Sequence, residues 1–147
     1  MNSIKREEIS RVVPLDKAIE VFDKNGFRNW LGNNHSEFAA LVARLEEEGF
    51  KIKSATEQVP VQMEGILPDG ENFYFRCRGK SCSLRVAAKG IEPLENPYWE
   101  LSKEQWEWPE AGWLGATEID SVFRGLLADY RKDLEKIKKV LPNLSEQ

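Results

Sequence analysis

The sequence contains few of the residues that form stabilising disulfides or structural metal sites. It holds two cysteines and one histidine among its 147 residues. Two thiols are too few for a disulfide framework or for a zinc site of four thiolates, and His35 has no second imidazole beside it. We therefore expect no structural metal and no cofactor.

Long apolar runs and the common catalytic signatures are missing as well. No window reaches the 18 or so consecutive apolar residues of a membrane helix, and the charges between Met1 and Glu8 have no apolar stretch behind them. We therefore expect no membrane span and no secretory signal, and a cytoplasmic location. The phosphate-binding P-loop pattern and the GxGxxG, GxSxG and HExxH patterns are absent too. These absences favour a binding protein and leave an enzyme of another class open.

The bulk composition is that of a folded, acidic protein. Hydrophobic residues make up 41% and charged residues 31%, with a formal net charge of −4. A chain of this length fits one domain, so we expect a single domain over residues 1–147. The net charge disfavours a polyanion such as nucleic acid as a general partner, because affinity for phosphates comes largely from lysine and arginine. A local basic patch remains compatible with it.

Three segments have helical periodicity. After a polar arm over 1–13, the spacing predicts two helices within 14–48, the first ending at Asn25-Gly26 and the second starting near Asn34. A long helix is predicted over 117–141, closed by Pro142. Its apolar stripe consists of Ile119, Val122, Phe123, Leu126, Leu127, Tyr130, Leu134 and Ile137.

The middle of the chain alternates instead with a period of two. This pattern predicts strands over about 59–67, 71–78 and 81–89, and a short fourth strand near 98–101 is possible. Gly79-Lys80 suits a two-residue hairpin turn, and Pro68-Asp69-Gly70 suits a three-residue turn. Both turns independently place the same apolar set on one face: Val61, Met63, Phe73, Phe75, Cys77, Cys82, Leu84 and Val86. The expected fold is α+β, an antiparallel β-meander of three to four strands with helices packed on one face.

The opposite, polar face is the first candidate site. The predicted register sets Glu64 opposite Tyr74 and Tyr74 opposite Arg85, while Arg76 lies opposite Gln62 on the same face. Arginines in this setting could hold a carboxylate or phosphate, since their planar forks bind such groups in a bidentate manner. The alternative is an ordinary solvated sheet face with cross-strand pairs.

A tryptophan-rich segment between 98 and 113 is the second candidate. Tryptophans are enriched at binding hot spots, so Trp106 and Trp108 could form a contact surface. Alternatively they cover the core, and if the rings lean over the arginine face the two candidates merge into one aromatic-walled pocket. Cys77 and Cys82 are expected to meet at a non-hydrogen-bonded pair, where an oxidative link is conceivable but two buried free thiols are favoured.

Three functions are compatible with these features. The leading hypothesis is a small acidic protein-binding module of the bacterial immunity or antitoxin-like kind, with a partner that is another protein and basic in charge. The second is a binder of a small anionic ligand, or an enzyme, that uses the Arg/Tyr/Glu face. The third rests on residues 36–50 followed by a hairpin, which resemble the helix-then-wing order of winged-helix nucleic-acid binders. That helix carries Arg44 as its sole cation against four glutamates, which makes nucleic acid an unfavourable partner.

Overall fold

The chain folds into a five-stranded antiparallel sheet with two long helices, in a computed structural model that describes residues 24–58 and 60–140, with side chains from residue 35 on. The strands are β1 (Lys51–Thr56), β2 (Val61–Ile66), β3 (Asn72–Arg78), β4 (Ser81–Ala87) and β5 (Trp99–Glu104). Their order in space equals their order in the chain, so the sheet is a simple meander. The α+β class and the meander are therefore confirmed, with one strand more than the upper limit predicted.

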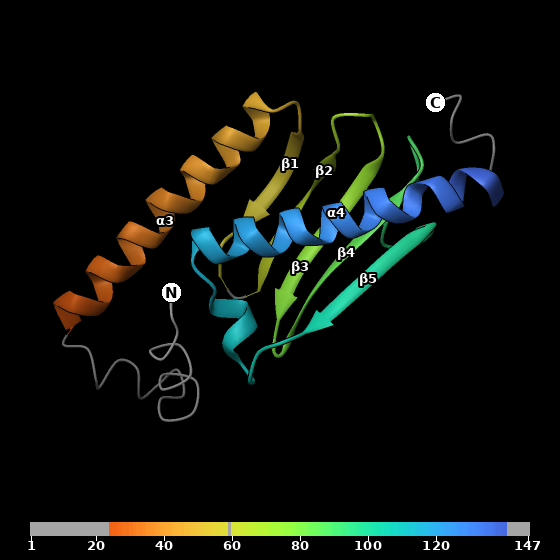
Figure 1. The fold of residues 1–147 in the computed structure, drawn as a ribbon. Coiled ribbons are helices and arrows are strands. Elements are labelled where there is room, and N and C mark those ends of the chain that lie inside the picture. The colour runs from red at the N-terminus through yellow and green to blue at the C-terminus, as the bar shows by residue number, and fades with distance from the viewer. Residues whose placement is uncertain (1–23, 59, 141–147) are drawn as a thin grey trace.

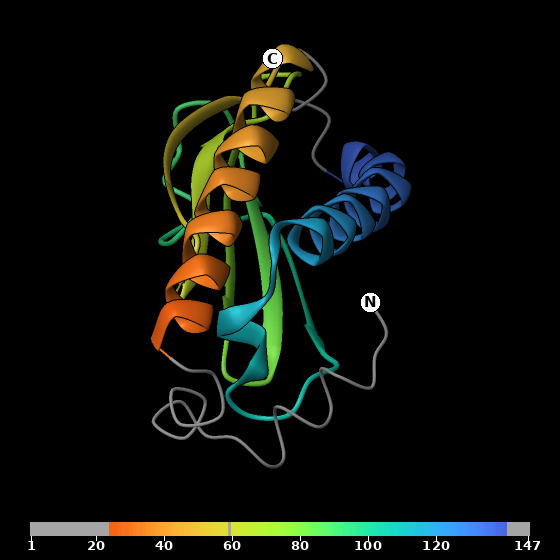
Figure 2. The same ribbon diagram turned by 90° about the vertical axis from the view of Figure 1, so that its left-hand side faces the viewer.

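Helix α4 (Ala116–Val140) crosses one face of the sheet, while α3 (Lys24–Glu47) lies beside β1 and packs against α4 near its own C-terminal end (Figures 1 and 2). A 3-10 turn, η1 (Glu110–Trp113), fills the space below α4 on the same side of the sheet. The opposite face carries no helix of the described chain.

The predicted register is confirmed pair by pair. Val61 faces Cys77, Phe73 faces Val86, and Arg78 faces Ser81 across the Gly79-Lys80 turn. Gly79 has a φ of +63° and Gly70 a φ of +107°, backbone conformations that favour glycine and that both hairpin turns require. Because the two turns fix the same register, every apolar residue of the predicted set is fully buried.

The core lies between this face and the helices. Phe123 of α4 is its centre, with ring centroids 5.1 Å from Phe75, 5.4 Å from Phe73 and 5.7 Å from Phe50. The predicted apolar stripe of α4 packs into or against this core along its whole length. Phe38, Leu41 and Leu45 of α3 are buried in it as well, as their helical spacing predicts.

Two predictions about the N-terminal half are wrong. The helix expected to begin near Asn34 is already formed at Lys24, the first described residue, and it continues through Asn25-Gly26, the expected end of the preceding helix. A glycine inside a helix costs about 1 kcal/mol relative to alanine, a penalty that a long helix tolerates. Strand β1 was not predicted at all. Two other predictions fall on residues outside the described part of the chain. They are the start of a helix at Pro14 and the end of the last helix at Pro142.

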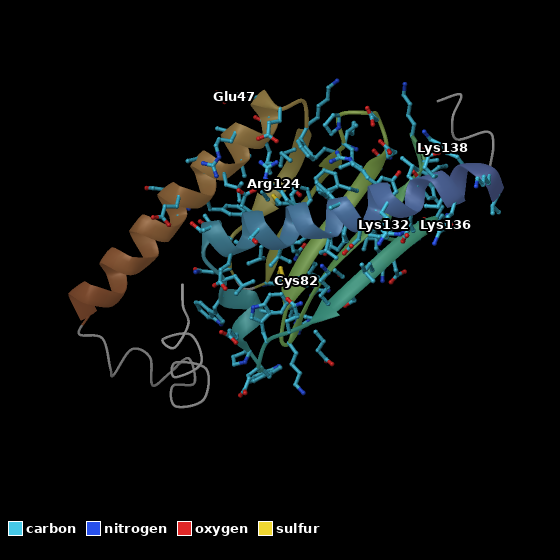
Figure 3. The ribbon with its side chains drawn as sticks, in the orientation of Figure 1. Glu47, Cys82, Arg124, Lys132, Lys136 and Lys138 are labelled. Carbon is cyan, nitrogen blue, oxygen red and sulfur yellow. A yellow bond between two sulfur atoms is a disulfide. The ribbon has the colours of Figure 1, made fainter. Side chains whose placement is uncertain are left out.

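The two cysteines are joined. Cys77 and Cys82 are fully buried and form a disulfide between the neighbouring strands β3 and β4, so the favoured expectation of two free thiols is wrong. Their Cα atoms lie 4.0 Å apart, the short spacing of a non-hydrogen-bonded antiparallel pair, as the register predicts. Figure 3 labels Cys82 just below α4, next to η1 in this view.

Candidate functional site

The polar face brings together the residues that the sequence placed there. Glu64 lies opposite Tyr74, Tyr74 opposite Arg85, and Arg76 opposite Gln62. The Tyr74 hydroxyl donates a 3.0 Å hydrogen bond to Gln62 Oε1. The predicted neighbourhood is correct, and its side chains are half-buried rather than freely solvated.

Arg85 is already engaged within the fold. Its Nη1 donates to the backbone oxygen of Leu94 at 3.2 Å, and its Nε lies 3.7 Å from a carboxylate oxygen of Glu100. Asn72 makes a second attachment nearby, donating to the backbone oxygen of Ile91 at 2.8 Å. These contacts hold the irregular segment 88–98 beside the polar face. Arg85 therefore helps to anchor this loop, and these contacts would compete with bidentate capture of an anion.

Arg76 differs from Arg85 in having an unsatisfied donor. Its Nε is buried and has no hydrogen-bond partner among the described residues. A buried donor left unpaired costs roughly 1–3 kcal/mol, so such groups usually have a function or an unseen partner. Of the two arginines proposed as an anion site, Arg76 is the one that retains capacity for a ligand.

The tryptophans separate into a core residue and a surface residue. Trp106 is 8% exposed and belongs to the core, while its backbone N–H donates to the backbone oxygen of Lys80 at 3.3 Å. Trp108 is 69% exposed and lies over Gly79, where an added Cβ would come within 3.2 Å of the indole Cδ1. Because Trp106 lies in the core and Trp108 covers the turn, the single aromatic-walled pocket over the arginine face does not form.

Exposed carboxylates accompany the exposed indole. Glu104 ends β5 opposite Ser81, and Glu107 directly precedes Trp108; both side chains are exposed. We call Glu104, Glu107 and Trp108 the acidic tryptophan patch. The exposed cations Arg78 and Lys80 flank Gly79, over which the Trp108 ring lies. Sequence reasoning named Trp108 but missed the glutamates, although the run Glu104-Gln105-Trp106-Glu107-Trp108 was a readable signal.

A buried polar cluster ties β5 to α4. The Tyr130 hydroxyl donates to Glu71 Oε2 at 2.7 Å and lies 2.6 Å from the Tyr98 hydroxyl, which must donate to it in turn. Burial raises the pKa of both tyrosine hydroxyls above the ordinary value, and the neighbouring Glu71 carboxylate raises the pKa further in each case. Nearby, the Trp99 indole donates to Asp133 Oδ2 at 3.1 Å. No local pattern in the sequence indicates this cluster.

Ion pairs join the two helices at the other end of α4. Arg124 makes a bidentate contact with Glu48 at 2.8 and 2.9 Å, and its Nε donates to Asp120 at 2.6 Å. Hydrogen bonding to Arg124 lowers the pKa of Glu48, and the same contact raises the pKa of Arg124. Arg44 lies 3.8 Å from Asp120. The one cation of the helix segment that resembled a winged-helix element is therefore paired with a carboxylate.

The charge changes sign along α4. Figure 3 labels Lys132, Lys136 and Lys138 along its second half, away from Arg124, with Lys138 on the opposite side of the helix from the other two. Cations at a helix C-terminus interact favourably with the helix dipole.

The comparisons with known proteins are negative throughout. No protein-family model, no curated protein and no solved structure matches the chain. The described residues include no helix that is both long and apolar enough to span a membrane. They also include no group of three or more histidine, cysteine, aspartate or glutamate side chains placed to hold a metal ion.

Proposed function

We propose that the chain is a protein-binding module, that its contact surface is the acidic tryptophan patch, and that its partner presents a basic segment there. The observation that carries the proposal is the position of Trp108, 69% exposed at the end of the sheet. Its size and net charge are compatible with the immunity or antitoxin-like kind of module, and they do not assign it to a family.

Trp108 has the properties of a binding anchor. An indole offers a large rigid area and one polar handle, which is why tryptophan is enriched among the few residues that dominate interface energetics. The ring rests on Gly79, so its orientation is restricted before any partner arrives. A pre-ordered anchor loses less conformational freedom on binding.

The carboxylates favour a cationic partner. Lysine or arginine over an indole face gains about 0.5–1 kcal/mol at an exposed site. Glu107 is the chain neighbour of Trp108 and Glu104 ends β5 just before it, and both carboxylates are exposed to a cationic partner. The formal net charge of −4 adds a long-range attraction that speeds association with a basic protein.

The test is a quantitative recovery of partners from native lysate on three immobilised proteins: wild type, Trp108→Ala and Leu94→Ala. Leu94 is a matched control because it is also an exposed apolar residue, 47% exposed, but lies on the segment beside the polar face. We expect a basic protein that wild type and Leu94→Ala retain and Trp108→Ala loses. Its retention should fall with added salt.

Two results would contradict this proposal. One is a partner that binds Trp108→Ala as well as wild type. The other is a retained set that is the same for all three proteins, provided that thermal unfolding confirms each variant is folded. Because Trp108 is mostly exposed, we expect its removal to leave stability within about 0.5 kcal/mol.

A second function, binding of a small anion, is favoured by Arg76 alone. Its buried Nε has no hydrogen-bond partner within the part of the chain that the structure describes, and a carboxylate or phosphate on the polar face would supply one. The thermal midpoint should then rise with millimolar phosphate or citrate in wild type and not in Arg76→Gln, since a ligand stabilises the state that binds it. An equal response in both proteins would remove this candidate.

A further inference from the structure

The two outer strands of the sheet are not equally protected. Strand β1 has a register shift between Ile52 and Ser54, and it carries the lysines Lys51 and Lys53. Helix α3 lies beside it (Figure 1). Bulges, lysines and covering helices are the devices by which proteins prevent another chain from adding to a sheet.

Strand β5 has an uninterrupted edge. All six of its residues pair with β4 in continuous register, from Val86 with Trp99 to Ser81 with Glu104, and the described chain places no strand on its other side. Figure 1 shows β5 as the outer strand, with α4 above the face and not beside the edge.

The register identifies which backbone groups are free. The Cys77–Cys82 pair has the 4.0 Å spacing of a non-hydrogen-bonded pair, so the backbone of Cys82 turns from β3 toward β5 and its partner Lys103. Backbone direction alternates along a strand. The outward N–H and C=O groups of β5 therefore belong to Glu100, Ser102 and Glu104.

The side chains of the same three residues are exposed on the helix-free face. The intervening side chains point to the core side, where Lys103 Nζ lies 3.1 Å from Asp129 of α4. The free edge thus combines three peptide groups that have no partner in the described chain with the carboxylates of Glu104 and of Glu100, the latter 3.7 Å from Arg85 Nε, and it leads directly into Glu107 and Trp108.

These carboxylates discriminate between possible occupants. If β5 paired with β5 of a second copy around Ser102, Glu100 of each copy would face Glu104 of the other, and like charges directly opposite one another destabilise a sheet. Cations in the same positions would be attracted. The edge is therefore unfavourable for self-association and favourable for a basic strand.

We propose that β5 is the docking site for an extended basic segment of the partner protein, which adds to the sheet as a sixth strand. The inference rests on the proposed function for the chemistry of the partner and adds the mode of recognition. Residues opposite each other in adjacent strands share a face, so the cations that meet Glu100 and Glu104 stand four residues apart in the segment. Residues beyond them reach the acidic tryptophan patch.

The probe is a capped octapeptide of alternating lysine and valine, with an octapeptide of alternating glutamate and valine as its control. Amide hydrogen exchange of the wild-type chain is followed by NMR with and without millimolar peptide. We expect the lysine peptide to slow exchange at Glu100, Ser102 and Glu104. The amides of Leu101 and Lys103 already bond to β4 and should change little.

A backbone variant supplies the second measurement. Ser102→Pro removes one outward N–H, which proline at an edge strand allows, whereas Ser102→Ala removes only the hydroxyl. We expect Ser102→Pro to weaken peptide binding about tenfold and Ser102→Ala to leave it within about twofold, because one peptide hydrogen bond is lost only in the former.

The outcomes separate the two proposals. If the lysine peptide shifts only the NMR signals of Glu107 and Trp108 and does not protect the three edge amides, strand addition is overturned. The proposal that the acidic tryptophan patch is the contact surface then still stands. Absence of binding, equal binding of the glutamate peptide, or equal affinity of the proline and alanine variants also overturns it. The lysate comparison of Trp108→Ala with Leu94→Ala decides the proposed function independently.

Discussion

Replacing Tyr130 with phenylalanine tests whether the buried polar cluster holds α4 to the sheet. The substitution keeps the aromatic ring, which is 1% exposed and lies 5.2 Å from the Trp99 ring in an edge-on contact. It removes only the hydroxyl that links Tyr98 to Glu71. The change therefore isolates two hydrogen bonds from the packing around them.

The expected loss of stability depends on whether each hydrogen bond joins a charged group or two neutral groups. A hydrogen bond to a charged group contributes about 1.5–3 kcal/mol, and one between neutral groups about 0.5–1.5 kcal/mol. Tyr98 and Glu71 are half-buried and regain some contact with water, so the lower part of the summed range applies. We expect Tyr130→Phe to lower the free energy of unfolding by about 2–3 kcal/mol.

Urea unfolding of three proteins checks the value: wild type, Tyr130→Phe and Tyr98→Phe. The control Tyr98→Phe leaves the bond from Tyr130 to Glu71 intact, so its loss should be about 1 kcal/mol. The reasoning is refuted if Tyr98→Phe costs as much as Tyr130→Phe, or if both lie within about 0.5 kcal/mol of wild type.

The same cluster gives a dependence on pH at the alkaline end. Burial raises the pKa of Tyr98 and Tyr130 in the folded chain, while in the unfolded chain both titrate near the ordinary value of 10.0. The unfolded state therefore releases these protons first, and stability that is complete below about pH 10 falls as the pH rises further. Unfolding curves measured on both sides of that pH should show that the free energy of unfolding decreases less with rising pH in Tyr130→Phe than in wild type.

Three further perturbations have defined outcomes. Phe123→Ala, at the centre of the aromatic core, should lower the free energy of unfolding by about 3–5 kcal/mol, and a thermal scan that shows a minor change would contradict the packing described. Reduction of the Cys77–Cys82 disulfide should cost about 2 kcal/mol, since it closes only a short loop; an unchanged urea midpoint after complete reduction would oppose this. Arg124→Gln should cost about 1 kcal/mol or less, because its side chain is 41% exposed and solvent screens the pair, and this loss should shrink in high salt.

Much of the sheet could be predicted because its signals are local and mutually consistent. Alternation of apolar and polar residues defines faces, and a glycine turn fixes pairing, so Phe73 and Val86 could be set opposite one another from the sequence. The composition of the polar face followed from the same register. The long helix was equally readable, since its apolar stripe continues from Ile119 to Ile137.

The rest depends on contacts that have no local signal. Strand β1 is mostly exposed and contains a register shift, so its residues do not alternate in the way that marks a strand. The partners of Arg85 come from the irregular segment 88–98, which has no periodicity to place it. Trp106 is buried in the core and Trp108 is exposed. The sequence does not predict which of the two is buried, because both are tryptophans in the same irregular segment.

The meander order described above has a consequence for how the chain emerges during synthesis. All five strands pair with their sequence neighbours, so the sheet can assemble through local contacts as the ribosome delivers them. The helix that covers their common face is residues 116–140, which are made after all five strands. Until α4 arrives, Phe73, Phe75 and Leu84 are left facing water, and a nascent or truncated chain that stops before Ala116 should need a chaperone to avoid aggregation.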